Sequence, residues 1–373
     1  MNFEPSQKRR LTENQKYRIV NINTAAPREP QSHILIIYTG GTFGMVSDEK
    51  GALVSFNFNQ IIRRFPSLKN LDLRLTVISF PNPVDSSDIT IQHWLDIAYI
   101  IYENYRQYDG FVILHGTDTM AYSASAISFL LENINKPVIF TGAQLPIGAI
   151  RTDARANLIT ALEIVSSKIN GVPAVPEVCI YFDYLLMRGN RVKKVRSSQF
   201  SAFETENYPL LAKAGISIEY NFDAIRKYEN DAPLIFHRKM DDHVASLKLY
   251  PGINKTVIET IFHIPGLKAV VMETFGSGNA PTSGWFLELV EDAINRGIII
   301  YNVSQCNKGR VIHGRYRTSR KLAELGVISG KDITFEAAIT KTMFLLGSES
   351  SIEEVKRKLT LNLRGEMEGP IYK

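Results

Sequence analysis

Two threonines follow predicted strands in this sequence, in the stretches YTGGTFGM and HGTDT. Thr42 comes after the run HILIIYT (33–39) and two glycines, and Thr117 comes after the run GFVILH (110–115). Both runs are rich in β-branched and aliphatic residues, which is typical of buried parallel strands. A threonine hydroxyl is a poor nucleophile unless a neighbouring group activates it. The two positions therefore direct attention to the groups that could activate a hydroxyl.

Candidate activating groups lie beside the second threonine and in a basic stretch further along the chain. A lysine held near neutral could draw off the threonine proton, and a carboxylate could orient that lysine. Asp118 is the candidate carboxylate, and the stretch RGNRVKKVR supplies Lys193 and Lys194, between which spacing alone does not choose. The alternative interpretation is structural. In that case Thr117 and Asp118 only cap the following helix, and the basic stretch is a solvated loop.

The loop PVDSSD follows another predicted strand and has two interpretations. It either runs into a helix cap, or it binds a carboxylate through backbone N–H groups and the hydroxyls of Ser86 and Ser87. His115 is interpreted as a buried, hydrogen-bonded residue at a strand end. The seven histidines show no HExxH pattern and the cysteines are not paired in sequence, so no metal site is predicted. The glycines match neither G-x-G-x-x-G nor a Walker A sequence, so no nucleotide cofactor is predicted.

Strands and helices alternate along the chain, the order that produces a parallel sheet covered by helices on both faces. Ligands bind outside the carboxyl ends of strands in such sheets, so the polar residues after each strand are the ones expected at a site. Strands are expected at 33–39, 76–80, 110–115, 137–142, 177–183, 267–276 and 297–304. Helices are expected near 57–65, at 87–108, 118–134 and 283–296, and near 334–347 and 351–363. Ser87 or Asp88 is placed to cap the helix at 87–108.

The chain is expected to contain two α/β blocks. The stretch 198–245 is more polar and less regular than its surroundings, which indicates a boundary within it or just after it. Folding is expected to begin near His33. The predicted division is a polar N-terminal extension at 1–32, an N-terminal α/β domain at 33–225, a linker at 226–248 and a C-terminal α/β domain at 249–373.

Composition predicts a soluble, cytoplasmic protein. The chain has 373 residues, 45% of them hydrophobic, and every apolar run is shorter than a membrane span, so no membrane association is predicted. The polar N-terminal residues lack the apolar stretch of a signal peptide, and two distant cysteines, Cys179 and Cys306, fit a reducing compartment. The formal charge is +5, but the basic clusters lack interleaved aromatic residues, so nucleic-acid binding is not predicted.

The stretches TGGTFGM and HGTDTMAYSASAISFLLEN together closely resemble the two signature stretches of bacterial-type L-asparaginases. Further stretches are similar to the type I, cytoplasmic branch of that family: DSSD, VIFTGAQLP, RGNRVKK, LYPGI, METFGSGNAP and NLRGEM. The resemblance implies a larger N-terminal parallel-sheet domain and a smaller C-terminal flavodoxin-like domain. It also implies cofactor-independent hydrolysis of the side-chain amide of L-asparagine to L-aspartate and ammonia.

The resemblance also implies roles for individual residues. Thr42 is the implied nucleophile, which forms an acyl-enzyme intermediate. Thr117 and Asp118 form a second group with a lysine, and Lys194 rather than Lys193 occupies that lysine position in the G-N-R-x-x-K pattern. The implied substrate-binding residues are Gly41, Asp85, Ser86, Ser87, Thr117, Asp118 and Asn279. Asn279 is implied to reach the site of a neighbouring subunit, because active sites of this family lie between the subunits of dimers, which often pair into tetramers.

The sequence departs from the family pattern at three places. Some relatives carry a tyrosine in the mobile loop after the first motif, whereas the matching stretch SDEKGALVS has none. Tyr316, in HGRYRT, resembles a tyrosine that serves instead in type I enzymes and is the implied catalytic tyrosine. Lys193 and Glu273 replace the threonine and arginine of an allosteric asparagine site, although Cys306 matches it. Allosteric activation is therefore not predicted.

Three alternative functions can be compared with the asparaginase prediction. An asparaginase-like amidase subunit of a tRNA-dependent amidotransferase carries an additional N-terminal domain, for which the extension at 1–32 is expected to be too short. A non-catalytic binding protein of the same fold would not need both threonines, the aspartate and the lysine. A nucleotide-dependent enzyme would need a phosphate-binding loop that the sequence lacks. These comparisons favour L-asparaginase.

Overall fold

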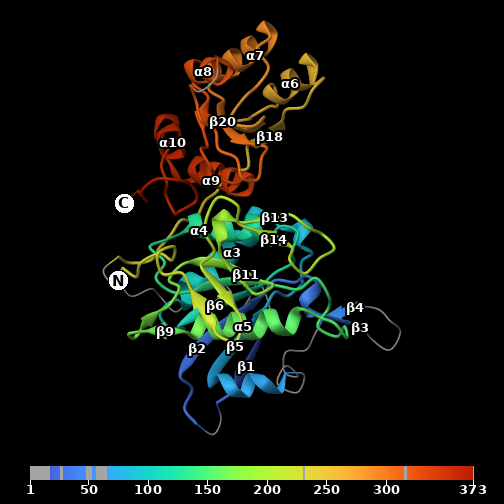
Figure 1. The fold of residues 1–373 in the computed structure, drawn as a ribbon, viewed down its shortest axis with the longest axis vertical. Coiled ribbons are helices and arrows are strands. Elements are labelled where there is room, and N and C mark those ends of the chain that lie inside the picture. The colour runs from blue at the N-terminus through green and yellow to red at the C-terminus, as the bar shows by residue number, and fades with distance from the viewer. Residues whose placement is uncertain are drawn as a thin grey trace.

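The structure is a computed structural model that describes residues 17–25, 28–47, 53–55, 65–229, 232–314 and 317–372. These residues form two α/β domains, one built on a nine-stranded sheet and the other on a four-stranded sheet. Figure 1 shows the smaller domain, coloured orange to red, above the larger one. The predicted two-domain α/β class is therefore confirmed. The helix predicted near 57–65 falls on residues outside the described ranges, except for Phe65, which precedes a 3-10 turn.

The larger sheet is parallel at its centre and antiparallel at its edges. Its strands in spatial order are β1 (Arg18–Asn23), β5 (Leu73–Ser79), β2 (Ser32–Tyr38), β6 (Gly110–Leu114), β8 (Val138–Thr141), β11 (Val178–Phe182), β12 (Leu185–Arg188), β15 (Ala212–Ala214) and β16 (Ile218–Tyr220). The run from β5 to β11 is parallel. Asp183 and Tyr184, both with positive φ, close a two-residue hairpin between β11 and β12. Such a hairpin joins antiparallel strands, so the sheet is mixed: the predicted parallel order holds from β5 to β11, and antiparallel strands are added at the edges.

The first strand of the sheet lies inside the predicted N-terminal extension. β1 pairs with β5 along its whole length, and Thr24 continues the contact by exchanging hydrogen bonds with Leu73. The expectation that folding begins near His33 is therefore wrong. β1 is an edge strand in which only Ile22 is buried, so its sequence lacks the apolar run that marks the central strands. The other predicted domain boundaries stay predictions.

Helices cover both faces of the larger sheet. α3 (Ile91–Asn104) and α4 (Met120–Leu130) share one core with alternate residues of β2, and α5 (Ala154–Ser166), which was not predicted, packs on the other face. α3 and α4 are shorter than predicted. The predicted cap of α3 at Ser87 or Asp88 is wrong, because these residues form a separate 3-10 turn. The cap is Thr90, whose backbone N–H donates to His93 Nδ1 at 3.0 Å.

The smaller domain has a parallel sheet between two helical layers. Its strands are β18 (Val244–Lys248), β19 (Ala269–Thr274), β20 (Ile299–Ser304) and β21 (Ile328–Ser329). Its helices are α6 (Lys255–Phe262), α7 (Gly284–Asn295), α8 (Arg317–Glu324), α9 (Phe335–Ser348) and α10 (Ile352–Leu359). β18 begins within the segment predicted as a linker, 226–248. α6 and α7 share a core on one face of this sheet, while α9 and α10 belong to the core on the other face.

Helix α9 joins the two domains. It packs against the smaller sheet on one side and against α4 of the larger domain on the other, so one apolar core runs through both domains. Phe129 of α4 stacks on Phe344 of α9 with ring centroids 5.8 Å apart. Figure 1 shows α9 at the junction, directly above α4. The shared core couples the position of α9 to that of the larger domain.

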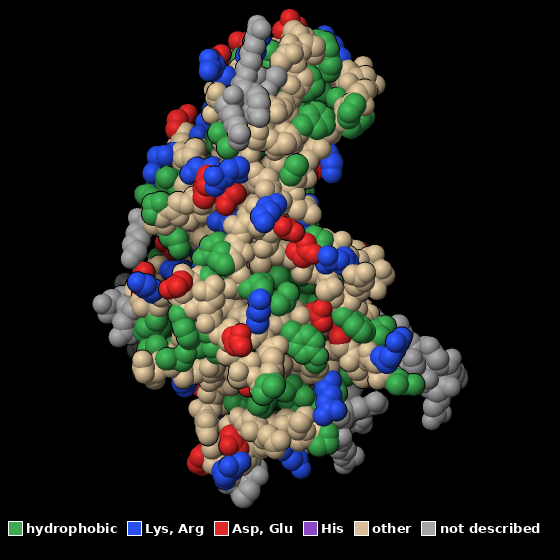
Figure 2. Space-filling view, viewed as in Figure 1, with side chains coloured by type: hydrophobic (Ala, Val, Ile, Leu, Met, Phe, Trp, Pro, Cys, Tyr) green, Lys and Arg blue, Asp and Glu red, His purple; other side chains and the backbone are tan. Residues whose placement is uncertain are grey.

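Short elements complete the described chain. Short strand pairs are β3 (Met45–Ser47) with β4 (Leu53–Ser55), β7 (Leu131–Glu132) with β17 (Ile235–Phe236), β9 (Lys168–Ile169) with β10 (Val172–Pro173), and β13 (Lys193–Lys194) with β14 (Phe203–Glu204). The 3-10 turns are η1 (Thr42–Gly44), η3 (Pro66–Leu71), η4 (Ser86–Asp88) and η5 (Gly189–Arg191). Within the described ranges, no helix combines the length and apolar character needed to cross a membrane. Figure 2 shows basic and acidic side chains interspersed on one face of the molecule.

Candidate active site

The ends of β2 and β6 bring the two predicted threonines to one edge of the larger sheet. Both the backbone N–H and the hydroxyl of Thr39 donate to the carbonyl of Leu114 at 3.1 Å. A Cβ atom on Gly41 would lie 2.6 Å from the backbone nitrogen and Cα of Gly116, and Gly41 has a φ of 82°. Only glycine fits this approach of two backbones. Thr42 and Thr117 are the residues that directly follow the touching glycines.

Lys194 contacts the second threonine group directly. Its Nζ atom donates to Thr117 Oγ1 at 2.8 Å and to Asp118 Oδ1 at 2.6 Å. The lysine side chain is 16% exposed, whereas the aspartate side chain is 67% exposed, so the pair lies at the boundary between the protein interior and solvent. Lys193 instead lies near Glu336 of the smaller domain. Burial raises the pKa of the Glu336 carboxyl, and the positive charge of Lys193 acts in the opposite direction. Of the two candidate lysines, the structure therefore brings Lys194 to Thr117.

Gln144 is a member of this cluster that the sequence analysis did not identify. The Thr117 hydroxyl donates to Gln144 Oε1 at 3.2 Å while it accepts from Lys194. The backbone N–H of Gln144 donates to both carboxylate oxygens of Asp153, and its side-chain amide donates to the carbonyl of Gln199 at 2.9 Å. The direction of the Thr117 hydroxyl is thus fixed at both its donor and its acceptor side.

The DSSD loop is tied to both strand ends. Asp85 caps η4 by accepting from the backbone N–H and the hydroxyl of Ser87, and these bonds lower the pKa of Asp85. Ser86 is buried, and its carbonyl accepts from the Thr119 hydroxyl at 2.6 Å. The backbone N–H of Val84 donates to the carbonyl of Thr39. The loop therefore lies beside the threonines, with Ser87 exposed and Ser86 packed against Gly116.

His115 is buried and bonded at both ring nitrogens, as predicted. Its Nδ1 lies 2.7 Å from the carbonyl oxygen of Gly116, and its Nε2 lies 2.9 Å from Ser123 Oγ, which accepts from Trp94 Nε1–H at 2.8 Å. Burial lowers the pKa of His115 to about 4, so the imidazole is neutral at pH 7. A carbonyl only accepts, so Nδ1 carries the proton and Nε2 accepts from Ser123. The chain of bonds fixes the peptide unit between Gly116 and Thr117.

One predicted site residue is not brought to this cluster within one chain, and the position of a second is not described. Asn279 lies in the smaller domain, in a turn after β19 where its backbone N–H and carbonyl pair with Phe275. Tyr316 lies outside the described residues. The cluster of one chain therefore consists of Gly41, Thr42, Asp85, Ser86, Ser87, Thr117, Asp118 and Lys194, with Gln144 added by the structure.

The arrangement provides hydroxyl groups, one cation and two carboxylates at the carboxyl ends of parallel strands. Such a set suits attack on a carbonyl carbon, because a hydroxyl can act as nucleophile and a lysine can exchange its proton. The model of the asparaginase N-terminal domain matches residues 33–226, and that of the glutaminase/asparaginase C-terminal domain matches residues 243–359. The chain belongs to the asparaginase family.

Individual members of this family match the present chain over most of its length. L-asparaginase 1 of Escherichia coli K12 is 39% identical over 336 residues, which are 90% of this chain and 97% of that protein. The crystal structure of L-asparaginase I from Vibrio cholerae O1 superposes with a TM-score of 0.81 at 40% identity and covers 90% of this chain and 99% of its own. The mouse protein named 60 kDa lysophospholipase is 40% identical over 365 residues, 91% of this chain, but the chain spans only 63% of its length.

Proposed function

We propose that this asparaginase-family chain is an L-asparaginase that hydrolyses the side-chain amide of L-asparagine to L-aspartate and ammonia. The observation that carries the proposal is the contact of Lys194 Nζ with Thr117 Oγ1 at 2.8 Å and Asp118 Oδ1 at 2.6 Å, beside the turn that holds Thr42. The fold by itself would not suffice, because similar sheets support many reactions. The proposal therefore depends on the residues at the strand ends.

The reaction proceeds through a threonine ester. The Thr42 hydroxyl oxygen bonds to the amide carbon as the carbon–nitrogen bond breaks, and the hydroxyl proton leaves with the ammonia. Water then attacks the ester carbon, releases L-aspartate and restores the hydroxyl. Proton transfer at the reacting atoms is assigned to the group of Thr117, Lys194 and Asp118, since Thr117 and Lys194 are within hydrogen-bond distance.

Backbone N–H groups near Thr117 are assigned to the developing oxyanion. A single well-placed donor lowers the barrier by roughly 3–4 kcal/mol in well-studied hydrolases. The peptide unit between Gly116 and Thr117 suits this task, because His115 holds its carbonyl at 2.7 Å and thereby fixes where its N–H points. The amino-acid end of the substrate is assigned to Gly41, Asp85, Ser86, Ser87 and Asp118. Holding that end orients the amide carbon toward the nucleophile.

The complete site is proposed to form between subunits of a dimer or tetramer. Asn279, in the smaller domain, is proposed to contribute to the substrate pocket of a second copy of the chain, as the family resemblance implies. Tyr316 is proposed as the tyrosine that acts with Thr42. No metal, nucleotide or other cofactor is assigned a step. The cytoplasmic location stays a prediction.

The decisive experiment compares single substitutions in an assay of ammonia release from L-asparagine and L-glutamine over a range of concentrations. Thr42→Ala is expected to lower kcat by about a thousandfold or more with an unchanged thermal melting curve. Lys194→Met is expected to lower kcat far more than Lys193→Met, which serves as the matched control. Substantial activity of Thr42→Ala would refute the nucleophile, and equal effects of the two lysine variants would refute the choice of Lys194.

A lysophospholipid substrate provides a second arm of the same assay. The mouse relative is named a lysophospholipase, and an ester carbonyl could react with the same hydroxyl. Ammonia release from L-asparagine that depends on Thr42, without fatty-acid release from lysophosphatidylcholine, is the expected result. Fatty-acid release that is lost in Thr42→Ala, without amide hydrolysis, would replace the proposed substrate while keeping the proposed nucleophile.

A further inference from the structure

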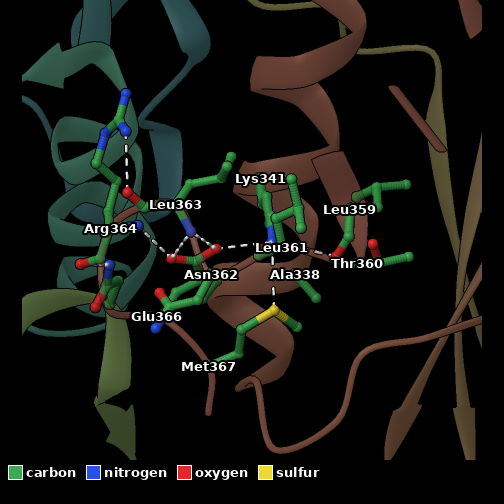
Figure 3. Close-up of polar contacts among 12 residues, drawn as sticks. Ala338, Lys341, Leu359, Thr360, Leu361, Asn362, Leu363, Arg364, Glu366 and Met367 are labelled. Atoms are coloured by element: carbon green, nitrogen blue, oxygen red, sulfur yellow. Dashed lines mark hydrogen bonds and ion pairs between the residues drawn. The ribbon is translucent and has the colours of Figure 1, made fainter. Parts of the chain in front are cut away.

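The smaller domain contains a fully buried ion pair between α9 and the segment that follows α10. Lys341 of α9 and Glu366 are both 0% exposed at their side chains, and Lys341 Nζ lies 2.7 Å from Glu366 Oε1. The lysine also donates to the carbonyls of Leu359 at 3.2 Å and Leu361 at 2.5 Å. Figure 3 shows this network between α9 and the C-terminal segment. Transfer of two charges out of water costs several kcal/mol for each ion, so the pair requires an explanation beyond packing.

Glu366 uses its remaining bonding capacity to shape a tight turn. Both carboxylate oxygens accept from the backbone N–H of Leu363, at 3.0 and 3.1 Å, and one also accepts from the N–H of Arg364 at 2.6 Å. The N–H of Gly365 donates to the side chain of Asn362 at 2.7 Å. Lys341 thus holds the carboxylate, and the carboxylate holds the backbone of 362–366.

Backbone carbonyls of the turn 362–366 accept hydrogen bonds from η5 of the larger domain. The carbonyl of Arg364 accepts from Asn190 Nδ2 at 3.1 Å, and the carbonyl of Gly365 accepts from Arg191 Nε at 2.7 Å. Arg191 also pairs with Asp332 of the smaller domain at 2.9 Å. Asn190 and Arg191 are buried. These bonds join two domains through residues that are far apart in the sequence.

Only Val192 separates η5 from β13, which carries Lys194. On the opposite side, η5 rests on α4, where the Ser125 hydroxyl lies 3.5 Å from the carbonyl of Gly189 and a Cβ on Gly189 would lie 3.1 Å from the Cβ of Ala124. α4 is the helix that follows Thr117 and Asp118. η5 is therefore held between the helix that continues from the active site and the turn of the smaller domain.

We propose that the Lys341–Glu366 pair is a positioning device that sets Lys194 Nζ against Thr117, through the turn 362–366 and η5. The inference rests on the proposed amidohydrolase function. Neither residue of the pair is assigned contact with the substrate. A shift of η5 by a fraction of an ångström would lengthen the 2.8 Å contact between Lys194 and Thr117 and slow proton transfer. Substrate binding by the DSSD loop would be left intact.

A double-mutant cycle with Glu366→Gln and Asn190→Ala tests this chain of contacts. Glu366→Gln keeps the side-chain shape but removes the charge that holds both the lysine and the turn. Asn190→Ala cuts one bond between the turn and η5. Each variant is expected to lower kcat by about tenfold with KM for L-asparagine within about twofold of the parent value. The double variant is expected to lose about tenfold as well, rather than the about hundredfold expected of independent sites.

Tyr301→Phe is the matched control. The Tyr301 hydroxyl is buried and donates to the carbonyl of Leu359 at 3.1 Å, so its removal costs one buried bond in the same segment and leaves the turn 362–366 untouched. This variant is expected to lower the melting temperature and keep the parent kcat. A Glu366→Gln variant that loses stability but keeps kcat, as the control does, would show that the pair is structural and would overturn the proposal.

Asn190→Ala keeps the test decisive if Glu366→Gln does not fold. In Asn190→Ala, kcat is expected to fall about tenfold while KM for L-asparagine stays within about twofold of the parent value, because only the contact of Lys194 with Thr117 is disturbed. A parent kcat, or a rise in KM that matches the fall in kcat/KM, would refute the positioning role. Absence of amidase activity in the parent protein would instead refute the proposed function, so the two failures are distinguishable.

Discussion

The buried imidazole of His115 predicts a specific loss of stability in mild acid. Its pKa falls from 6.5 to about 4 in the folded chain, chiefly because burial disfavours the charged form, with a smaller contribution from the nearby His93. The hydrogen bond to the carbonyl of Gly116 acts in the opposite direction. As the pH falls, the unfolded chain therefore takes up this proton before the folded chain does.

The magnitude follows from the two pKa values. Each pKa unit corresponds to about 1.4 kcal/mol, so the shift from 6.5 to about 4 predicts that the free energy of unfolding decreases by about 3 kcal/mol over that interval. The contribution is fully present above pH 6.5 and is lost as the pH falls through the interval toward the folded pKa. Above pH 6.5 the stability should not depend on this residue's titration.

His115→Asn isolates this contribution. Asparagine has no titratable proton and can still donate from its side-chain amide toward the carbonyl of Gly116. Urea unfolding of both proteins at a series of pH values gives the difference in unfolding free energy, and carboxylates that titrate in both proteins cancel. The parent's advantage over His115→Asn is expected to shrink by about 3 kcal/mol between pH 6.5 and pH 4. A difference that stays constant over this range would show that His115 is not held neutral by burial.

Two further predictions concern the fixed geometry at the strand ends. Gln144→Leu removes the acceptor of the Thr117 hydroxyl and is expected to lower kcat by about tenfold, an increase in the barrier of about 1.4 kcal/mol; unchanged kcat in the ammonia assay would refute a role for Gln144. Gly41→Ala places a Cβ 2.6 Å from the backbone of Gly116 and is expected to lower both the melting temperature and kcat. The matched control is Gly171→Ala, which has a similar φ of 81° but no atom within 4 Å of its Cβ position; equal melting temperatures for the two variants would contradict the importance of the close approach.

The sequence predicted the central strands well because burial on both faces produces continuous apolar runs. Six of the seven residues of β2 are buried and His33 is partly buried, so the apolar run within HILIIYT predicts the strand. β1 has the opposite character, since most of RIVNIN is exposed at the sheet edge. The antiparallel edge beyond β11 depends on a hairpin at Asp183 and Tyr184, which carries no glycine to mark its positive φ values.

The site was predictable to the extent that it follows the rule of polar residues after strands. Thr117 and Ser86 follow that rule and were identified. Gln144 follows it as well, since it comes shortly after β8, so the same rule predicts a role for it. The choice between Lys193 and Lys194 could not come from spacing. Successive residues of a strand point to opposite faces, and only the pairing of β13 with β14 decides which lysine faces Thr117.

The contacts between the domains cannot be predicted from local sequence patterns. Asn190 and Arg191 meet the carbonyls of Arg364 and Gly365 across 174 positions, and neither segment carries a periodic pattern that predicts the other. Yet these bonds hold η5, which is followed by β13, the short strand that contains Lys194. A smaller domain without influence on the active site would not need a buried charge pair that holds this turn. The burial of Lys341 and Glu366 therefore argues that the smaller domain also supports the active site of its own chain.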